Sequence, residues 1–519
     1  MEKIAQLLLC LLFLLIFAVR TLHYIHMFQL NSYKSKVQCK WLLKNAAALW
    51  KQSALLLLGP VLPLVLPNRL ASTVALLVVY AVTLVLNLPP KAKKPLVYTK
   101  RVIRLLVTCT VVLALLCLAI YLSAGKEILA CGIATVSLLL VPFLILLCNL
   151  INRPVELAIN RYYIRDAKKI LASHESLITV GVTGSYGKTS VKFMLGALLG
   201  AKYDVLVTPE NYNTPLGVTK TIRNSLRATH DVFVCEMGAK HVGDIKEICD
   251  IVHPRHGIIT SVGPQHLESF HTLENVQKTK FELAEALPQW GTLCVNGEDA
   301  NIQSFSCPRP AVTYGFSADC DYYATNLSVT LAGTTFTVHH KQETATFKVS
   351  LIGRHNVLNL IGAIAICCEL GIDLQKLPPY ARKIQPVTHR LQLTRRGNTA
   401  IIDDAYNANP SGVKAAMDVL SLFDGFRIVI TPGMVELGSV EYEENYKFGK
   451  LMAQVCDFVV LVGEKQTQPI YKGLTDSGFD TQKIFVAANL NEGAEKAFSL
   501  QVAPQEKIVL FENDLPDNY

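Results

Sequence analysis

The stretch Leu177–Leu195, LITVGVTGSYGKTSVKFML, decides the fold of the second half of the chain. It opens with an apolar run that predicts a short buried strand and closes with Phe193, Met194 and Leu195, which predict a helix. The glycine loop between them suits a phosphate cradle and consists of Gly184, Ser185, Tyr186, Gly187, Lys188, Thr189 and Ser190. In such a cradle backbone N–H groups and the helix dipole face the anion, the lysine neutralises it, and the threonine offers its hydroxyl to Mg²⁺.

The loop departs from the strict phosphate-loop pattern. That pattern would place its first glycine at position 182, which holds Val182, and the chain has Gly181 and Gly184 instead. On this loop alone, an ordinary strand-to-helix turn therefore remains an alternative to nucleotide binding.

The first part of the chain is far more apolar than the rest. The 519 residues are 51% hydrophobic, and the excess lies before Asn152. A helix needs roughly 20 apolar residues to cross a bilayer. We predict five spans in an all-α transmembrane domain: Ile4–Val19, Ser53–Leu66, Leu70–Leu88, Val102–Ser123 and Ile128–Ile151. No small-residue cleavage site follows the first stretch, so it is predicted to be an uncleaved span and not a signal peptide.

Basic residues between the spans predict the orientation. They gather in three segments and comprise Lys34, Lys36, Lys40, Lys44, Lys91, Lys93, Lys94, Lys100, Arg101, Arg104, Arg153, Arg161, Arg165, Lys168 and Lys169. Because Lys and Arg concentrate on the cytoplasmic side, the N-terminus should lie outside and everything after Asn152 in the cytoplasm, as in a multi-pass protein of the cell membrane. The net charge of +9 then indicates attraction to a lipid surface and not nucleic-acid binding.

The 14 cysteines form no CxxC pair and no zinc spacing, so they are predicted to be buried, reduced thiols. After the spans comes a basic, partly helical connector, residues 153–176. From Leu177 onward, strand-like and helix-like segments alternate, which predicts α/β domains with mainly parallel sheets.

We predict four parts: residues 1–152, 153–176, 177–387 and 388–519. Between Tyr322 and Ser350 the period changes to two, which predicts a small antiparallel patch. The last part is predicted to be a smaller Rossmann-like domain, but it lacks a dinucleotide glycine fingerprint, so NAD is not proposed.

Three further residues are candidates for metal or phosphate chemistry. Glu236 follows the strand Val232–Cys235, where a carboxylate beside a phosphate loop is placed to hold Mg²⁺, although a solvated loop acid is the alternative. His266 follows a neighbouring strand, and a structural or solvated histidine is the alternative. Lys280 lies in a predicted helix, where the residue pattern alone indicates a surface lysine.

Two polar segments stand at predicted helix starts. In GRHNVLN, Arg354, His355, Asn356 and Asn359 could be caps, but asparagines at helical spacing also suit base recognition. In DDAYNANP, residues 403–410, the alternative to a functional role is an Asx-rich N-cap before the next helix.

Together these stretches resemble the Mur ligase family of ATP-dependent enzymes that form amide bonds, and within it most closely the members that add D-alanyl-D-alanine. The segments that carry the resemblance are, in order, GVTGSYGKTS, NYNTPLGV, EMG, GPQHLESF, QKTKFEL, GRHNVLN, DDAYNANP and GMVELG. They extend from about Leu177 to near the C-terminus. The family's phosphate loop has the form TGSxGKT, so the displaced glycine is a family trait.

The resemblance implies a role for each matching residue. Lys188 and the loop amides would hold the ATP phosphates, with Thr189 and Glu236 on Mg²⁺ and His266 in the metal shell. Lys280 falls where the family has a carbamylated lysine, an anion that bridges to a second Mg²⁺.

The remaining implied contacts are with the nucleotide. His355 and Asn356 match the adenine-contacting segment, with Asn359 beside them. Arg390 matches an arginine near the γ-phosphate. The ribose and hinge-side contacts of the last domain are matched by Asp404, Tyr406 and Asn407.

The implied reaction is phosphoryl transfer from ATP to a substrate carboxylate, followed by amine attack on the acyl phosphate. Two departures concern the substrate. Membrane spans occupy the place of the family's first domain, which holds the UDP-sugar, and the ending VLFENDLPDNY lacks the family's glycine–serine–arginine type of terminus. A soluble muramoyl peptide and a membrane-linked or polymeric acceptor both remain open.

Two other functions stay as alternatives. A polyglutamate-type synthase would share the ATPase core. A transporter or nucleotide-gated regulator would need ionisable residues inside the spans, and the apolar cores of the second to fifth spans have none.

Overall fold

The computed structural model describes residues 2–66, 68–88, 94–124, 127–330, 332–405, 408–435, 437–502 and 504–513. They form two compact units, the first ending at Arg161 and the second beginning at Tyr162. The boundary falls inside one long helix, so the predicted connector is mostly a continuation of the last helix of the first unit.

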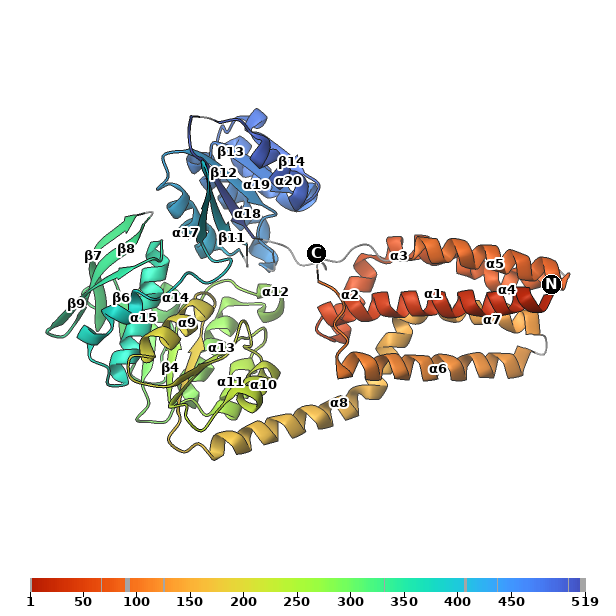
Figure 1. Cartoon of the computed structure of the whole chain (residues 1–519), viewed down its shortest axis with the longest axis horizontal. Coiled ribbons are helices and arrows are strands. Elements are labelled where there is room, and N and C mark those ends of the chain that lie inside the picture. Colours follow the sequence, from red (N-terminus) through yellow and green to blue (C-terminus); the bar gives the residue numbers. More distant parts are fainter. Residues whose placement is uncertain are drawn as a thin grey trace. The chain divides into compact units, whose positions relative to one another are not determined.

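The first unit is helical. Its segments are α1 (Glu2–Leu30), α2 (Ser35–Lys44), α3 (Ala46–Ser53), the 3-10 turn η1 (Ala54–Leu57), α4 (Leu58–Val65), α5 (Arg69–Leu86), α6 (Lys100–Ala124), α7 (Glu127–Leu139) and α8 (Val141–Ala172). In Figure 1, α1 lies along α5, and α4 packs on α7. Among the described residues, four helices are long and apolar enough to cross a membrane: Lys3–Leu30, Arg69–Leu86, Lys100–Ser123 and Val141–Ala172.

This arrangement differs from the five predicted spans. The stretch Ser53–Leu66 forms only η1 and the short helix α4, and Ile128–Ile151 is divided between α7 and α8 by a turn at Leu140. The short helices pack closely because both carry glycine. A Cβ on Gly132 would lie 2.4 Å from the carbonyl oxygen of Gly59, so only glycine permits this backbone contact.

The second unit begins with a mainly parallel sheet. Its strands are β1 (Ile178–Thr183), β2 (Val205–Val207), β3 (Val232–Glu236), β4 (His256–Ile259), β5 (Leu293–Asn296), β6 (Val312–Gly315), β7 (Tyr322–Thr330), β8 (Gly333–His340) and β9 (Glu343–Val349). The strand order is β2-β3-β1-β4-β5-β6-β7-β8-β9, parallel as far as β7 and antiparallel from β7 to β9. The antiparallel patch predicted between Tyr322 and Ser350 is thus confirmed.

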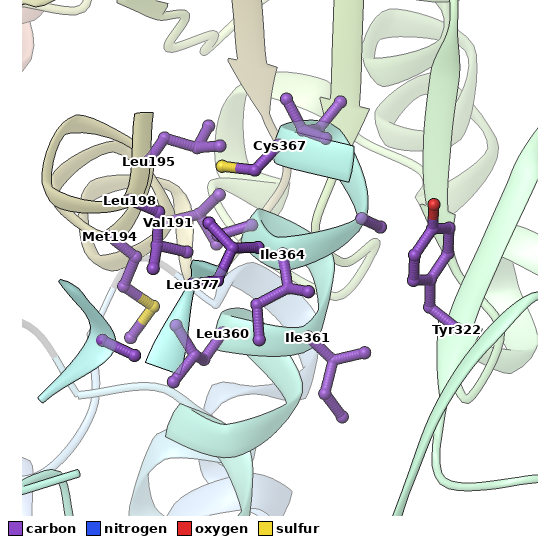
Figure 2. Close-up of a cluster of buried hydrophobic side chains, with 14 of the residues drawn as sticks. Val191, Met194, Leu195, Leu198, Tyr322, Leu360, Ile361, Ile364, Cys367 and Leu377 are labelled. Atoms are coloured by element: carbon purple, nitrogen blue, oxygen red, sulfur yellow. The ribbon is translucent and has the colours of Figure 1, made fainter. Parts of the chain in front are cut away.

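Helices cover both faces of this sheet. They are α9 (Lys188–Leu199), α10 (Pro215–Ser225), α11 (Asp244–Val252), α12 (Leu267–Phe270), α13 (Leu273–Ala286), α14 (Ala300–Gln303), α15 (Arg354–Glu369), η2 (Leu374–Lys376) and α16 (Pro378–Ala381). On one face α9 packs against α15, and Figure 2 shows Leu195 and Leu198 of α9 beside Leu360 and Ile364 of α15. A separate core with α11 and α13 fills the other face. Both faces of the sheet are therefore buried, which explains the nearly continuous apolar runs of its strands.

A second sheet follows, in the order β10-β11-β15-β12-β13-β14. Its strands are β10 (Gln392–Arg396), β11 (Thr399–Asp404), β12 (Phe426–Thr431), β13 (Phe458–Val462), β14 (Ile484–Ala487) and β15 (Lys507–Glu512), and its helices are α17 (Pro410–Leu420), η3 (Gly438–Val440), α18 (Glu441–Val455), α19 (Glu464–Asp476), η4 (Thr481–Lys483) and α20 (Leu490–Ser499). Only β10 is antiparallel to its neighbour. The predicted fold class, parallel-sheet α/β domains after a helical region, is confirmed.

Candidate active site

The phosphate loop joins β1 to α9 and is fixed by the segment that follows β4. Ser185 N donates to the Ser261 carbonyl at 2.7 Å, and Tyr186 N donates to Ser261 Oγ at 2.8 Å. Ser185 Oγ donates to the Gly263 carbonyl at 3.1 Å and accepts from Gly263 N at 3.0 Å. The loop is therefore held in shape by its own backbone neighbours, before any nucleotide is bound.

Lys188 opens α9 and points back over the loop. Its Nζ donates to the carbonyl oxygens of Gly184 at 2.8 Å and Ser185 at 3.1 Å. Burial lowers the pKa of Lys188 to about 8; Glu236 opposes this shift and Arg390 adds to it. An ammonium held only by carbonyl dipoles is suited to neutralising an incoming phosphate.

Glu236 ends β3 and gathers polar side chains around its buried carboxylate. Oε1 accepts from Thr189 Oγ1 at 3.2 Å and from Asn213 Nδ2 at 2.9 Å, while Oε2 lies 3.1 Å from Lys192 Nζ. Its backbone N–H donates to Thr208 Oγ1 at 3.1 Å. The parallel pairing of β1 with β3 brings this strand end beside the loop, as the sequence predicts.

Sequence reasoning missed Lys192. It is fully buried on α9, and its Nζ also donates to the Glu210 carbonyl. The sequence did contain a signal for Lys192. It lies one helical turn after Lys188, and residues four apart lie on the same face of a helix.

The donors present fit Mg²⁺. This ion is usually bound by one or two carboxylates together with substrate phosphates and waters, and Thr189 with Glu236 supplies a hydroxyl and a carboxylate. Among the residues that the structure describes, no group of three or more His, Cys, Asp or Glu side chains gathers as a metal site.

Lys280 is buried on α13, so the surface position that the residue pattern indicated is wrong. Burial lowers the pKa of Lys280 well below its usual range, and the charge of Lys188 lowers it further, against Asp244 and Glu282. Glu282 accepts from Gly243 N at 2.6 Å and Lys246 N at 2.9 Å at the start of α11. This environment favours the neutral amine over the ammonium, and the neutral amine is the form that reacts with CO₂.

His266 stands immediately before the short helix α12. Its φ is 54°, in the left-handed region, and its carbonyl accepts from Ser269 N at 2.9 Å and Phe270 N at 3.0 Å. The backbone of His266 thus shapes the loop after β4, which is the same segment that holds the phosphate loop.

The start of α15 meets the phosphate loop through Asn359. A Cβ on Gly187, where φ is 79°, would lie 2.5 Å from Asn359 Oδ1. Asn356 instead donates from Nδ2 to the Ile352 carbonyl at 2.9 Å and secures the start of its own helix. Burial lowers the pKa of His355 to about 4, and its Nδ1 has no hydrogen-bond partner among the described residues.

Arg390 connects the two sheets electrostatically. Its charge lowers the pKa values of Lys188 and His355 and opposes the rise at Asp404. Burial raises the pKa of Asp404 to about 6, while Leu391 N donates to its Oδ1 at 3.1 Å. Tyr406 and Asn407 lie outside the described residues.

Part of the DDAYNANP segment is a helix cap. Asn409 Oδ1 accepts from Gly412 N at 2.9 Å, and Pro410 takes the first position of α17. A residue that sequence reasoning missed is Glu512, which pairs with Asp404 across β11 and β15 and is fully buried.

These features define a class of protein. A phosphate loop with a lysine and a hydroxyl–carboxylate pair, set beside a second α/β sheet, is the apparatus of an ATP-dependent enzyme that transfers a phosphoryl group. The comparisons with known proteins make the class specific. Residues 182–367 match the Mur ligase middle domain, and residues 389–511 match the Mur ligase glutamate ligase domain.

Similar proteins of known identity support the same family. The chain is 30% identical over 329 residues to the UDP-N-acetylmuramoyl-tripeptide–D-alanyl-D-alanine ligase of Escherichia coli K12, covering 61% of this chain and 73% of that enzyme. The enzyme of the same name from Bacillus subtilis 168 is 32% identical over 278 residues, covering 53% of this chain and 60% of that enzyme. A crystal structure of MurF from Acinetobacter baumannii superposes with a TM-score of 0.63 at 26% identity, covering 68% and 77% of the two chains.

The chain belongs to the Mur ligase family, whose members are ATP-dependent ligases that form C–N bonds. The two family models lie within the second unit. Residues before 182 match neither family model, and more than a quarter of the E. coli enzyme lies outside the aligned part.

Proposed function

We propose that this chain is a membrane-anchored, ATP-dependent ligase of the MurF type in cell-wall precursor synthesis. It activates a substrate carboxylate as an acyl phosphate and joins it to the amine of an amino acid or dipeptide. The observation that carries the proposal is the group formed by Lys188, Thr189 and Glu236 at the adjoining ends of β1 and β3. Its setting in two Mur ligase domains supports it further, and we take residues 177–387 and 388–519 as their extents.

In the first step the γ-phosphoryl group passes from ATP to the carboxylate, and ADP leaves. Lys188 and the loop amides between Gly184 and Ser190 hold the phosphates, and Arg390 offsets charge that develops near the γ-phosphate. Phosphate binding stabilises the ammonium form of Lys188, because an anion beside Nζ opposes the lowering of its pKa.

Mg²⁺, when bound, would offset the negative charge of the phosphate groups. Thr189 and Glu236 are the side chains that would hold it, with His266 in the same shell. We propose that Lys280 reacts with CO₂ to give a carbamate that would hold a second ion. Its burial favours the neutral amine, and the nearby charge of Lys188 favours the anionic product.

In the second step the amine attacks the acyl phosphate, the C–N bond forms and phosphate leaves. The last domain contributes Asp404, Tyr406 and Asn407 to the ribose and hinge side of the nucleotide, and His355, Asn356 and Asn359 face the adenine. Closure of this domain over the nucleotide would exclude water, which otherwise hydrolyses the acyl phosphate.

We also propose that the first unit anchors the enzyme in the cell membrane with its catalytic domains in the cytoplasm. The four long apolar helices support this, as do large apolar side chains on their outer faces, such as Leu7 at 63% and Leu115 at 61% exposure. Water-facing helices would not expose such side chains in rows. The lysines and arginines between the helices favour the cytoplasmic side for the catalytic unit.

The test is ligation by the full chain in lipid nanodiscs with ATP and Mg²⁺. ADP release and product mass are measured with UDP-N-acetylmuramoyl-tripeptide plus D-alanyl-D-alanine, and separately with glutamate as the amine. We expect Lys188→Ala to abolish ADP release, while Lys220→Ala, which removes an exposed lysine of α10, serves as the matched control. ATP turnover that is unchanged by Lys188→Ala would overturn the site, and a product carrying glutamate would identify a polyglutamate-type synthase.

A further inference from the structure

The helices of the first unit enclose an apolar groove. Side chains of α1, α5, α6 and α7 line a cavity of about 420 Å³, among them Phe13, Phe17, Tyr80, Cys117 and Ala134. The only polar group of Tyr80 is satisfied, because its hydroxyl lies 2.9 Å from Thr135 Oγ1. The groove therefore presents hydrocarbon and sulfur surfaces, and its volume falls within the range of about 300–1,000 Å³ typical of small-molecule pockets.

A buried arginine, Arg20, lies between α1 and α5, which are two of the four helices that line the groove. Arg20 is 2% exposed; its Nη1 donates to Ser53 Oγ at 2.8 Å and to Asn87 Oδ1 at 2.6 Å. Its guanidinium lies over the Tyr24 ring at 5.5 Å, and its Nε has no hydrogen-bond partner. Within the described part of the chain, Arg20 contacts no carboxylate, so its charge is offset only by neutral groups.

Along both α1 and α5, the groove comes first and the Arg20 site follows it. The rings of Phe13 and Tyr80 lie 6.3 Å apart, and Arg20 bonds Asn87; both pairs are 67 residues apart in sequence. An equal offset means that α1 and α5 run parallel, and seven residues of helix advance about 10 Å. Between the pairs lies the buried Thr83 Oγ1, which also has no partner among the described residues.

The positive charges place the Arg20 end of the groove at the cytoplasmic boundary. Beyond it, α1 leads to a segment with Lys34 and Lys36, and α5 leads to the basic stretch before α6. Arg101, at the start of α6, stacks on the ring of Tyr33, which follows α1, at 4.0 Å. A headgroup bound at Arg20 would thus emerge on the side to which we assign the catalytic unit.

We propose that this groove and Arg20 bind the lipid part of the acceptor, an isoprenoid chain that carries a phosphate. The apolar chain lies along Phe13, Phe17 and Ala134, and the phosphate accepts hydrogen bonds from the Arg20 guanidinium and the Thr83 hydroxyl. A buried charge without a counter-ion is costly, and a phosphate supplies the missing charge. The proposal rests on the proposed ligase function and names its substrate class, a lipid-linked carboxylate.

Two observations favour this occupant over ordinary membrane phospholipid. Phe17 lines the groove and the buried Arg20 follows three residues later on α1, about one helical turn away, which suits a single chain with a phosphate at its end. The family models match the chain only from residue 182 onward, so the first unit lies outside them and is where recognition of a lipid-linked acceptor can be added.

The test is binding to the full chain in nanodiscs of neutral lipid, without ATP, so that it is independent of ligase activity. Labelled polyprenyl phosphate, the matching polyprenol, phosphatidylglycerol and inorganic phosphate are titrated separately. We expect polyprenyl phosphate to bind about tenfold tighter than polyprenol, the factor that one charge-assisted hydrogen bond supplies, and tighter than phosphatidylglycerol. Inorganic phosphate should not compete, since it lacks the chain.

Three variants distinguish recognition of the phosphate from recognition of the apolar chain. Arg20→Gln should bring the affinity for polyprenyl phosphate down to that for polyprenol, while Ala134→Phe, which fills the groove, should weaken both. Lys36→Gln removes an exposed charge from the same side and should change neither. Equal affinity of the wild type for polyprenyl phosphate and polyprenol, or for polyprenyl phosphate and phosphatidylglycerol, would overturn the proposal even if ligase activity is found.

Discussion

Replacing Lys192 with methionine tests the electrostatic organisation of the site. The Lys192 ammonium and the Glu236 carboxylate are 0% and 1% exposed and lie 3.1 Å apart, so neither is screened by solvent. Removing one member of a buried ion pair costs about 3–5 kcal/mol, because the other charge stays buried. Glu236 keeps its hydrogen bonds from Thr189 and Asn213, so we take the lower limit, about 3 kcal/mol. At roughly 2–4 °C per kcal/mol, Lys192→Met should lower the Tm by about 6–12 °C.

Mg²⁺ gives the experiment a functional readout. In the variant a bound cation would replace the lost ammonium beside Glu236, so Mg²⁺ should raise the Tm of Lys192→Met more than that of the wild type. The assay is thermal unfolding of the full chain in nanodiscs at increasing MgCl₂, with Lys220→Met as the surface control. Adding Glu236→Gln to Lys192→Met should recover most of the loss. A Tm within 2 °C of the wild type, or an equal response to Mg²⁺, would refute this account of the pair.

Three further outcomes are expected. The Kd for ATP should be constant below pH 8, then weaken by up to about tenfold per pH unit, because the free enzyme loses the Lys188 proton near pH 8 whereas the complex retains it; a flat profile to pH 9.5 would contradict this. With ¹³C-bicarbonate, NMR should show a carbamate signal that Lys280→Ala abolishes. Burial raises the pKa of Asp404 to about 6 and that of Glu512 well above its usual range, so the stability that both carboxyl groups contribute at low pH is lost as pH rises, through about 6 for Asp404. Glu512→Gln should therefore raise the Tm by about 2–4 °C at pH 8, where roughly 1 kcal/mol is recovered, and less at pH 5.

The catalytic half of the fold could be predicted because its strands are buried on both faces. In runs such as Val232–Cys235 and Phe458–Val462, apolar residues follow one another without interruption. Strands with one exposed face would alternate apolar and polar residues instead. The edge strand β10 was missed because Gln392–Arg396 carries exposed polar side chains. The division of the apolar region into helices could not be predicted, since apolar content does not reveal where a helix breaks, as it does at Leu140.

The site could be predicted wherever residues are adjacent in sequence or share a strand end. Lys188, Thr189 and Glu236 fall in this group. Lys192 and Arg20 do not, because a lysine or arginine at a helical position looks like a surface residue until its neighbours are known. Their burial follows from tertiary packing, which places one against Glu236 and the other between α1 and α5.

The displaced glycine of the loop has a physical cause. Val182 is fully buried in β1, paired with Glu236 on one side and Ile258 on the other, so the strand still needs a side chain at the position where the strict pattern has glycine. The turn begins two residues later, at Gly184, where a Cβ would lie 2.0 Å from Thr260 Oγ1. The glycine therefore marks where the loop touches Thr260, the residue after the neighbouring strand β4, and the shift in the pattern reflects two more strand positions before the turn.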